Sequence, residues 1–467
     1  MDDLELYESL SYSRKHVFDV ISDAEKAEML ALCDEYRAFL DEGKTERECV
    51  CVAEKMAQEA GFLPLDSFET LKEGDRVYSV NRGKNVFMAI IGSEDIEEGI
   101  NICGAHIDSP RLDLKQNPLY ESEDMALFKT HYYGGIKKYQ WTAIPLAIHG
   151  VIHTREGKPV YVNIGEKEED PVFCITDLLP HLAKDQMVKK MSEGIEGENL
   201  NILIGGFPMG KDVKERVKFG ILKLLNERYG ITEGDFLNAE IEIVPAFKAK
   251  NVGLDESFIG AYGQDDRVCA FTTLKGIIDT KSVKKTAIAI LVDKEEIGSC
   301  GNTGMLSAFF EMQVAELIEK LKGECSMTVY NRVMSNSACL SSDVNAAVDP
   351  NYASAFEKNN ASLAGYGMCI IKYTGARGKS GSSDASSEFM YKVEKIMSDN
   401  NVSWQSGELG KVDQGGGGTI AQYVANLNID VVDCGVPVLS MHAPFEITAK
   451  TDVYMAYRAY KAFYKDR

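Results

Sequence analysis

A buried apolar run that ends in charged residues is the feature that most constrains the fold of this chain. Residues 287–292 read AIAILV, with Lys285 before the run and Gly298 shortly after it. Such a run predicts an interior strand of a parallel sheet. Glu295 and Glu296 follow it closely. Because ligands gather at the carboxyl ends of strands in open α/β sheets, this pair is either a solvated strand exit or part of a functional site.

The same arrangement of an apolar strand and polar residues at its exit recurs elsewhere in the chain. A single histidine at such a place is more often structural than a ligand. Imidazole and carboxylate groups that recur at matching positions are, however, the groups that bind Zn²⁺ or a similar ion. The strand exits carry His106 and Asp108 in INICGAHID, Asp265 and Asp266 in AYGQDDR, Asp343 in SACLSSDV, and His442 in GVPVLSMH.

These side chains suffice for two metal ions. Two divalent ions ~3.5 to 4 Å apart need one bridging carboxylate and about two further ligands each. One ion could take His106, Asp265 and Asp343. The other could take Asp265 again, together with Glu296 and His442.

The remaining carboxylates have separate expected roles. Adjacent residues of an extended segment point to opposite sides, so we expect Glu295 to face away from its neighbour Glu296. Glu295 could then act as a general base toward a metal-activated water. Asp108 lies two residues after His106 and is expected to fix the tautomer of that histidine.

The order of patterns predicts an α/β fold with an insertion. A chain of 467 residues exceeds the size of a single core, so two domains are expected. The α/β rhythm is interrupted by short alternating strands and a charged helical stretch. We predict one discontinuous domain, residues 1–116 and 253–467, and an inserted domain, residues 117–252. The expected helices span 24–58, 268–278 and 305–321, and the expected strands include 287–292 and 326–333.

Composition limits the kinds of partner that the chain is expected to bind and the cell compartment in which it is expected to work. The 51 basic and 72 acidic residues give a net charge of −21, which opposes binding to nucleic acid or to an anionic membrane. The start, MDDLELYESLSYSRK, has no signal-peptide core, and no apolar run reaches the ~18 residues of a membrane span. The 11 cysteines lack paired spacing and are expected to be small buried hydrophobes. Together these features predict a cytoplasmic protein.

Five motifs, in this order, resemble those of the aspartyl aminopeptidase family of dinuclear-zinc metallo-aminopeptidases. They are GAHIDSP, GQDDR, VDKEEIGS, SSDVNAAVDPNY and LSMHAPFE, and the resemblance covers essentially the whole chain, including YYGG at 132–135. The resemblance implies a zinc-exopeptidase-like mixed sheet flanked by helices and interrupted by an inserted β-rich dimerisation domain. It also implies a homo-oligomer, in this family usually a tetrahedral dodecamer that encloses the active sites.

The resemblance further implies the activity and the roles of residues. The chain would release N-terminal amino acids from peptides, by attack of a metal-bridged water that Glu295 activates. The cofactor would be two divalent ions, with Zn²⁺ expected and Mn²⁺ or Co²⁺ as alternatives. Asp265, rather than Asp266, matches the bridging aspartate of the family. The other matching ligands are His106, Glu296, Asp343 and His442.

Several departures from the family pattern bear on the substrate. Ala346 and Asp349 stand where the family usually has histidines, Phe445 where it has arginine, and Asp185 where it has a histidine that reaches a neighbouring subunit. An acidic substrate side chain needs cationic or donor partners, so these losses leave an Asp or Glu preference open. The cationic residues that remain as candidates are Lys372 and Arg377.

Two alternatives to an aminopeptidase stay open at this point. A related dinuclear deacylase or dipeptidase could use the same motifs on small amides. A protein of another class, a non-catalytic assembly or cargo protein with this fold, would be expected to have lost a ligand or the base. All of these residues are present.

Overall fold

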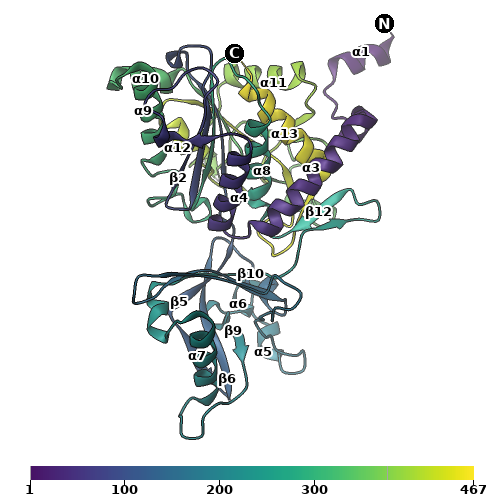
Figure 1. The fold of residues 1–467 in the computed structure, drawn as a ribbon. Coiled ribbons are helices and arrows are strands. Elements are labelled where there is room, and N and C mark those ends of the chain that lie inside the picture. Colours follow the sequence, from purple (N-terminus) through teal and green to yellow (C-terminus); the bar gives the residue numbers. More distant parts are fainter. Residues whose placement is uncertain (1, 376, 467) are drawn as a thin grey trace.

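The computed structural model describes residues 2–375 and 377–466. Figure 1 shows a larger part, in which helices flank a sheet, and a smaller part built around a second sheet. The predicted mixed α/β fold is therefore confirmed. Among the described residues, no helix combines the length and the apolar character that a membrane crossing requires.

A nine-stranded mixed sheet forms the centre of the larger part. Strands β4 and β13 are buried along their whole length, as the apolar runs predict, and they pair in parallel so that His106 lies opposite Val292. Strand β14 pairs in parallel with the other edge of β4. The order is β1 (Leu63–Pro64), β2 (Arg76–Asn81), β3 (Asn85–Ile90), β13 (Thr286–Val292), β4 (Ile100–His106), β14 (Ala338–Ser341), β18 (Asp430–Gly435), β16 (Met368–Ile371) and β17 (Trp404–Ser406).

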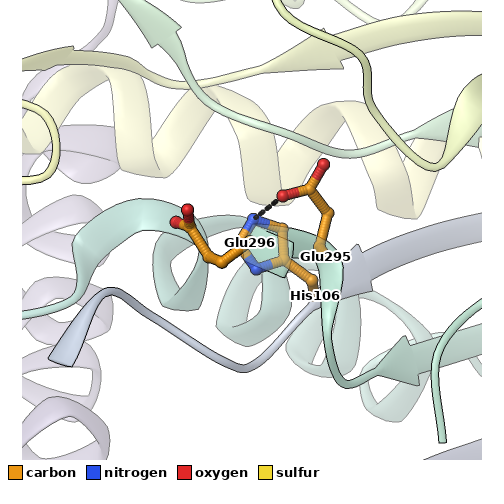
Figure 2. Close-up of side chains that lie close together, drawn as sticks. All are labelled: His106, Glu295 and Glu296. Carbon is orange, nitrogen blue, oxygen red and sulfur yellow. Dashed lines mark ion pairs between the residues drawn. The ribbon is translucent and has the colours of Figure 1, made fainter. Parts of the chain in front are cut away.

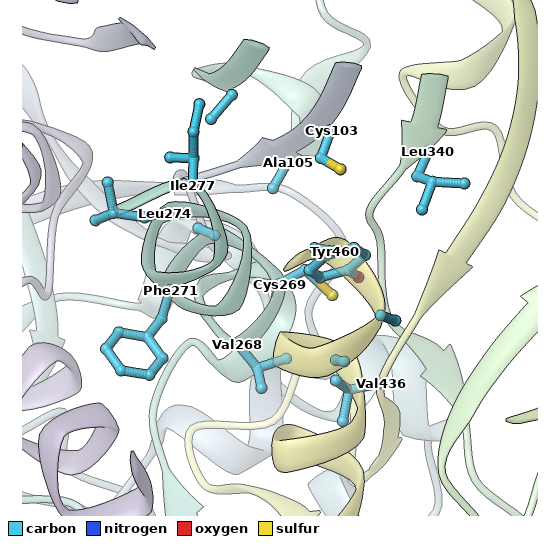
Figure 3. Close-up of a cluster of buried hydrophobic side chains, with 14 of the residues drawn as sticks. Cys103, Ala105, Val268, Cys269, Phe271, Leu274, Ile277, Leu340, Val436 and Tyr460 are labelled. Carbon is cyan, nitrogen blue, oxygen red and sulfur yellow. The ribbon is translucent and has the colours of Figure 1, made fainter. Parts of the chain in front are cut away.

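Helices cover both faces of this sheet. Alternate residues of β4 and β13 enter two separate hydrophobic cores, as the pleat requires. Figure 3 shows the first core, where side chains of α8 pack against Cys103 and Ala105 of β4 and against Tyr460 of α13. Helices α3 (Asp23–Glu42), α4 (Glu46–Glu59), α8 (Gln264–Ile278), α11 (Ser387–Asp399) and α13 (Lys450–Tyr464) contribute to that core, and α9 (Phe309–Lys322), α10 (Met327–Ser335) and α12 (Ala421–Ala425) to the other. Two short helices, α1 (Asp3–Leu10) and α2 (Val17–Val20), precede them.

Three predicted elements were wrong in type or extent. The expected strand 326–333 is helix α10, which begins where the Ser326 side chain accepts a hydrogen bond from the Val329 amide. The expected helix 24–58 is two helices, because the Thr45 side chain starts a new helix with a capping box to Glu48. The expected helix 305–321 begins only at Phe309.

The smaller part is an antiparallel six-stranded sheet with its own hydrophobic core. All of its strands come from one continuous stretch of the chain, which begins at Arg111 and ends at Pro245. The predicted limits, 117 and 252, and the division into two domains stay predictions. The order is β8 (Pro159–Ile164), β7 (Leu146–His153), β10 (Glu240–Pro245), β5 (Arg111–Ser122), β6 (Met125–Tyr133) and β9 (Ile202–Gly205), with helices α5 (Lys184–Met187), α6 (Met191–Gly194) and α7 (Arg216–Tyr229).

A third sheet was not predicted. It has five short strands from distant parts of the chain, and it lies at the start of α8 and on both sides of His442. The predicted strand exits therefore come from two different sheets rather than one. Its order is β11 (Lys250–Val252), β12 (Phe258–Ala261), β20 (Glu446–Ala449), β19 (Pro437–Leu439) and β15 (Asn345–Ala346).

The cysteines follow the prediction in part. Of the 11 free cysteines, seven are buried, including Cys103, Cys269 and Cys434. Two are exposed, Cys51 and Cys300. Six of the buried ones pack as small apolar side chains in the two cores of the larger part, and Cys369 is buried outside these cores.

Candidate metal centre

His106 is the last residue of β4 and is 1% exposed. Its Nε2 atom lies 3.2 Å from Asp265 Oδ1, 3.8 Å from Glu295 Oε2 and 3.9 Å from Asp343 Oδ1. Figure 2 shows Glu295 and Glu296 on different sides of the imidazole ring, with the dashed line marking the pair with Glu295. The structure thus brings together residues that are nearly 240 positions apart in the sequence.

His442 forms the other side of the same cluster. It lies between β19 and β20 with a left-handed backbone, φ 63°. Its Nε2 atom is 3.1 Å from Asp265 Oδ2 and 3.5 Å from Glu296 Oε1. The two carboxylate oxygens of Asp265 therefore face two different histidines, which is the arrangement expected of a carboxylate shared by two ions.

The clustered donors match part of the predicted ligand sets. Asp265, Glu296 and His442, the members of one predicted ligand set, form a group in which a single ion could contact all three. On the other side, His106 and Asp343 group with Asp266, whose carboxylate also accepts a hydrogen bond from the His106 amide at 3.4 Å. His106, Glu295 and Glu296 form a third group. The preference for Asp265 over Asp266 thus stays a prediction, supported by the distances to both histidines.

The residues fit a bound cation. Glu296 Oε1 is buried and has no hydrogen-bond donor among the described residues. A buried carboxylate oxygen without a donor is costly unless a cation neutralises it. Imidazole and carboxylate are also the ligand types that Zn²⁺ prefers.

The sequence predicted that Glu295 and Glu296 lie in an extended segment. The structure shows that they do not. Lys294 adopts a left-handed backbone, φ 67°, and Glu295–Ile297 form a 3₁₀ turn. The amides of Glu295 and Glu296 donate to Asp108 Oδ1 and Oδ2, at 3.1 and 3.2 Å. Asp108 therefore holds the turn that presents both glutamates.

Asp108 also lies beside His106, and its expected role in fixing the tautomer of that histidine stays a prediction. Its Oδ1 is 3.3 Å from His106 Nδ1, and its carbonyl oxygen is 3.0 Å from the same nitrogen. The Tyr133 hydroxyl donates to Asp108 Oδ2 at 2.7 Å. With Nδ1 held in this way, His106 presents Nε2 to the cluster.

Burial and mutual repulsion perturb the acidic groups. Burial raises the pKa of Glu295 to about 7, and Asp108 and Asp265 add to this effect against the opposing histidines. Burial likewise raises the pKa of Glu296 and of Asp343 well above their usual values. Burial lowers the pKa of His442, but Asp265 and Glu296 outweigh it and raise the pKa to about 10. A cluster of carboxylates with pKa values perturbed in this way is typical of a functional site.

The cluster opens into a cavity of about 340 Å³. In the part of the chain that the structure describes, neither lysine nor arginine lines it. Lys372, a candidate anion partner, instead pairs with Asp384 at 3.0 Å on the surface, and Arg377 is also exposed. Asp265, Glu295, Glu296, Asp343 and His442 line the cavity, together with residues 416–418, Val344, Asn345, Ile371, Thr374, Leu409, Thr419, Asp433 and Met441.

The positions that depart from the family pattern lie around this cavity or away from it. Ala346 and Asp349 line a second cavity of about 630 Å³ that also reaches His442. Phe445 packs against Phe247, with ring centroids 5.4 Å apart, and is not among the residues that line either cavity. Asp185 lies exposed in α5.

Sequence reasoning missed three supporting residues. The Glu446 carboxylate accepts hydrogen bonds from the amides of His442 and Asp265, at 2.6 and 3.0 Å. The Gly135 carbonyl lies 2.8 Å from His442 Nδ1, and Tyr133 holds Asp108. Glu446 ends the motif LSMHAPFE, and Tyr133 and Gly135 belong to YYGG at 132–135, but no spacing rule connects these two motifs.

Comparisons with known proteins identify the family of the chain. The family model for aminopeptidase I zinc metalloprotease (M18) matches residues 39–464. A probable M18 family aminopeptidase 1 from Clostridium acetobutylicum is 52% identical, over 96% of this chain and 97% of that protein. One from Thermotoga maritima is 48% identical, over 94% of this chain and 96% of that protein.

Solved structures show the same fold. The M18 family aminopeptidase crystal structure from Thermotoga maritima superimposes with a TM-score of 0.95 at 46% identity, covering 98% of this chain and all of that one. Yeast aminopeptidase 1, at 20% identity, shares the fold with a TM-score of 0.76, over 93% of this chain and 97% of that one. The relatives named are aminopeptidases, which supports the leading prediction over a deacylase, a dipeptidase or a non-catalytic protein. The chain is therefore a metal-dependent aminopeptidase of the aminopeptidase I zinc metalloprotease (M18) family.

Proposed function

We propose that this enzyme releases N-terminal amino acids from peptides at a centre of two zinc ions. His106, Asp265 and Asp343 would hold one ion, as the sequence predicts. Asp265, Glu296 and His442 would hold the other. The observation that carries the proposal is the position of Asp265, whose two oxygens lie 3.2 Å from His106 Nε2 and 3.1 Å from His442 Nε2.

Glu295 is the proposed general base. Two divalent ions bound at these residues would lower the pKa of a water molecule and polarise the peptide carbonyl. The Glu295 carboxylate faces the cavity and belongs to neither proposed ligand set. It can accept the proton of the attacking water and then deliver it to the nitrogen of the leaving amine. Asp108 orients both the base and His106 through its contacts with the Glu295 amide and the imidazole.

The cavity favours neutral rather than acidic N-terminal residues. A carboxylate side chain in a buried site needs a cationic or donor partner. No described lysine or arginine lines the cavity of about 340 Å³, where Ile371 and Leu409 add apolar surface and the donors, such as the Thr374 hydroxyl, are uncharged. Lys137 lines only the second cavity. The substrates proposed are therefore peptides whose first side chain is uncharged.

Residues 117–252 are proposed to mediate self-association in a cytoplasmic homo-oligomer. This stretch exposes several large apolar side chains that water would disfavour on an isolated chain. A solved S. cerevesiae mApe1 structure, 20% identical, is a dodecamer, and we propose the same assembly here. The exposed apolar residues include Leu182, Met187, Val188, Met191 and Phe207.

The assay that tests this proposal compares chromogenic amides of leucine, aspartate and N-acetylleucine. We expect chelator-sensitive cleavage of the free-amine substrates alone, with leucine faster than aspartate. Glu295→Gln should lose ~10²- to 10⁴-fold in turnover, because a general base contributes about that much. Its zinc content, measured by metal analysis, should stay unchanged.

A matched control keeps the test specific. Glu324→Gln makes the same change at an exposed loop position and should behave as the wild type. Wild-type turnover by Glu295→Gln would refute the role of Glu295. Cleavage of the acetylated amide alone would instead identify a deacylase.

A further inference from the structure

The end of strand β6 reaches the metal centre, although the strand belongs to the six-stranded sheet. The hydroxyl of Tyr133 donates to Asp108 Oδ2 at 2.7 Å. Two residues later, the Gly135 carbonyl lies 2.8 Å from His442 Nδ1. A Cβ on Gly134 would lie 3.3 Å from Glu296 Oε2. The backbone between Tyr133 and Gly135 therefore passes close to this candidate ligand. One short segment thus touches both halves of the cluster.

Tyr133 is held from outside the cluster. The Arg111 guanidinium lies over its ring, 3.9 Å from the centroid. Arg111 is itself tied to Asp113 at 2.8 Å and to Glu242 at 3.3 Å, with Glu46 of helix α4 at 3.6 Å. Burial raises the pKa of Tyr133, with Asp108 adding to the effect, so the hydroxyl stays protonated and acts as a donor. The ring position is therefore set by the junction between the two parts of the molecule.

Asp108 connects Tyr133 with the rest of the site through its two carboxylate oxygens. Its Oδ2 accepts from Tyr133 and from the Glu296 amide, while its Oδ1 accepts from the Glu295 amide and faces His106 Nδ1. Without the tyrosine hydroxyl, Oδ2 would keep a single donor, and the carboxylate could rotate away from the histidine. Partners of this kind set the orientation and basicity of ligating histidines and typically change metal affinity by about 10- to 100-fold.

We propose that residues 133–135 supply the outer shell of both ion sites. Tyr133 is a positioning residue that acts through Asp108 on His106, and the Gly135 carbonyl fixes the tautomer of His442. This inference rests on the ligand sets proposed above. It makes zinc affinity depend on how the six-stranded sheet is seated against the larger part of the molecule.

The test measures zinc dissociation constants of the full chain by competition with a chromogenic chelator. Tyr133→Phe keeps the ring and its contact with Arg111 but removes the donor, and it should weaken zinc binding about 10-fold or more. The control is Tyr132→Phe, which deletes the same hydroxyl from the adjacent residue, 43% exposed, and should bind as the wild type does. Equal affinities for Tyr133→Phe and Tyr132→Phe would overturn the role of Tyr133.

A double-mutant cycle with Asp108→Asn separates positioning from a general loss of stability. If Tyr133 acts through Asp108, Tyr133→Phe should cause no further loss of affinity in the Asp108→Asn background. Additive losses would contradict the proposed route, because the two residues would then act independently. Far-ultraviolet circular dichroism and the melting temperature of each metal-free variant check that the chain folds.

The second arm addresses Gly135. In Gly135→Ala the new Cβ would lie 3.3 Å from His442 Nδ1, so zinc binding at that half should weaken. Gly206→Ala is the control, since a Cβ there meets nothing within 4 Å. Equal binding by these two variants would contradict the role of Gly135. His106→Ala tests the proposed ligand sets themselves. If this variant binds zinc as the wild type does, the ligand sets are wrong, and so is the inference that rests on them.

Discussion

The two halves of the metal centre are built in different ways. His106 ends a central strand that is hydrogen-bonded on both sides, and the residue is 1% exposed. The side chain of His442 is 35% exposed and lies in a loop between two short strands. The first half is therefore positioned by the sheet itself, and the second by individual contacts with Gly135 and Glu446.

One shared carboxylate thus joins a site whose ligand is held by a strand, at His106, and a site whose ligand is held by a loop, at His442. Ligands on regular elements hold their geometry more precisely than ligands on loops. Asp265 belongs to both halves, because its two oxygens face the two histidines. We therefore expect the ion beside His106 to bind more tightly, and the ion beside His442 to exchange more readily with solvent.

The largest expected effect comes from removing either histidine. His442→Ala should retain one zinc per chain, whereas His106→Ala should fall below one, because it removes the better-held half. Each loss of affinity should exceed the ~10- to 100-fold typical of outer-shell changes. Metal analysis after dialysis measures the content, and His153→Ala, an exposed histidine in β7, is the control. The reverse order of zinc contents would break the comparison.

Zinc binding should depend on pH at both halves, because burial is outweighed by nearby carboxylates, which raise the pKa of both His106 and His442. The pKa of His442, raised to about 10, keeps this ring protonated at neutral pH in the metal-free protein, and its proton must leave when zinc binds. Glu295, with a pKa of about 7, also releases a proton when a nearby cation favours its ionised form. Affinity should therefore fall as the pH is lowered, by about tenfold per pH unit for each proton released.

Competition titrations between about pH 8 and about pH 6 measure this slope. In His442→Ala the proton of residue 442 no longer takes part, so the slope of log Kd against pH should be shallower by about one. Equal slopes in the wild type and the variant would show that His442 binds no ion.

The smallest expected effect is at Glu446. Its carboxylate accepts the amides of His442 and Asp265, at 2.6 and 3.0 Å, and a glutamine keeps only one acceptor oxygen for these two donors. Glu446→Gln should weaken the more weakly bound zinc by about 10-fold, the lower end of outer-shell effects, and the tighter zinc less. Stepwise zinc titration separates the two, with Glu324→Gln as the control. Equal losses at both sites would remove the proposed asymmetry.

Prediction from the sequence succeeded where the signal is local. The apolar runs of β4 and β13 identified buried strands. The polar residues at their ends are His106, Glu295 and Glu296, which the structure brings close together, while their roles stay predictions. It was wrong where a local pattern has two solutions, since the apolar positions of 326–333 suit a surface helix as well as a strand. It also placed Glu295 and Glu296 in an extended segment, because a left-handed Lys294 leaves no sign in the residue order.

The sequence by itself determined which side chains are available for chemistry, because strand burial and residue type are written along the chain. Only the tertiary structure decided that Asp265 faces both histidines, that Lys372 turns to Asp384, and that the end of β6 touches both halves of the centre. The physical reason is that the contacts of Asp265 and of the end of β6 join residues at the ends of strands from three different sheets. Their distances depend on how whole layers pack together, and no local pattern encodes that packing.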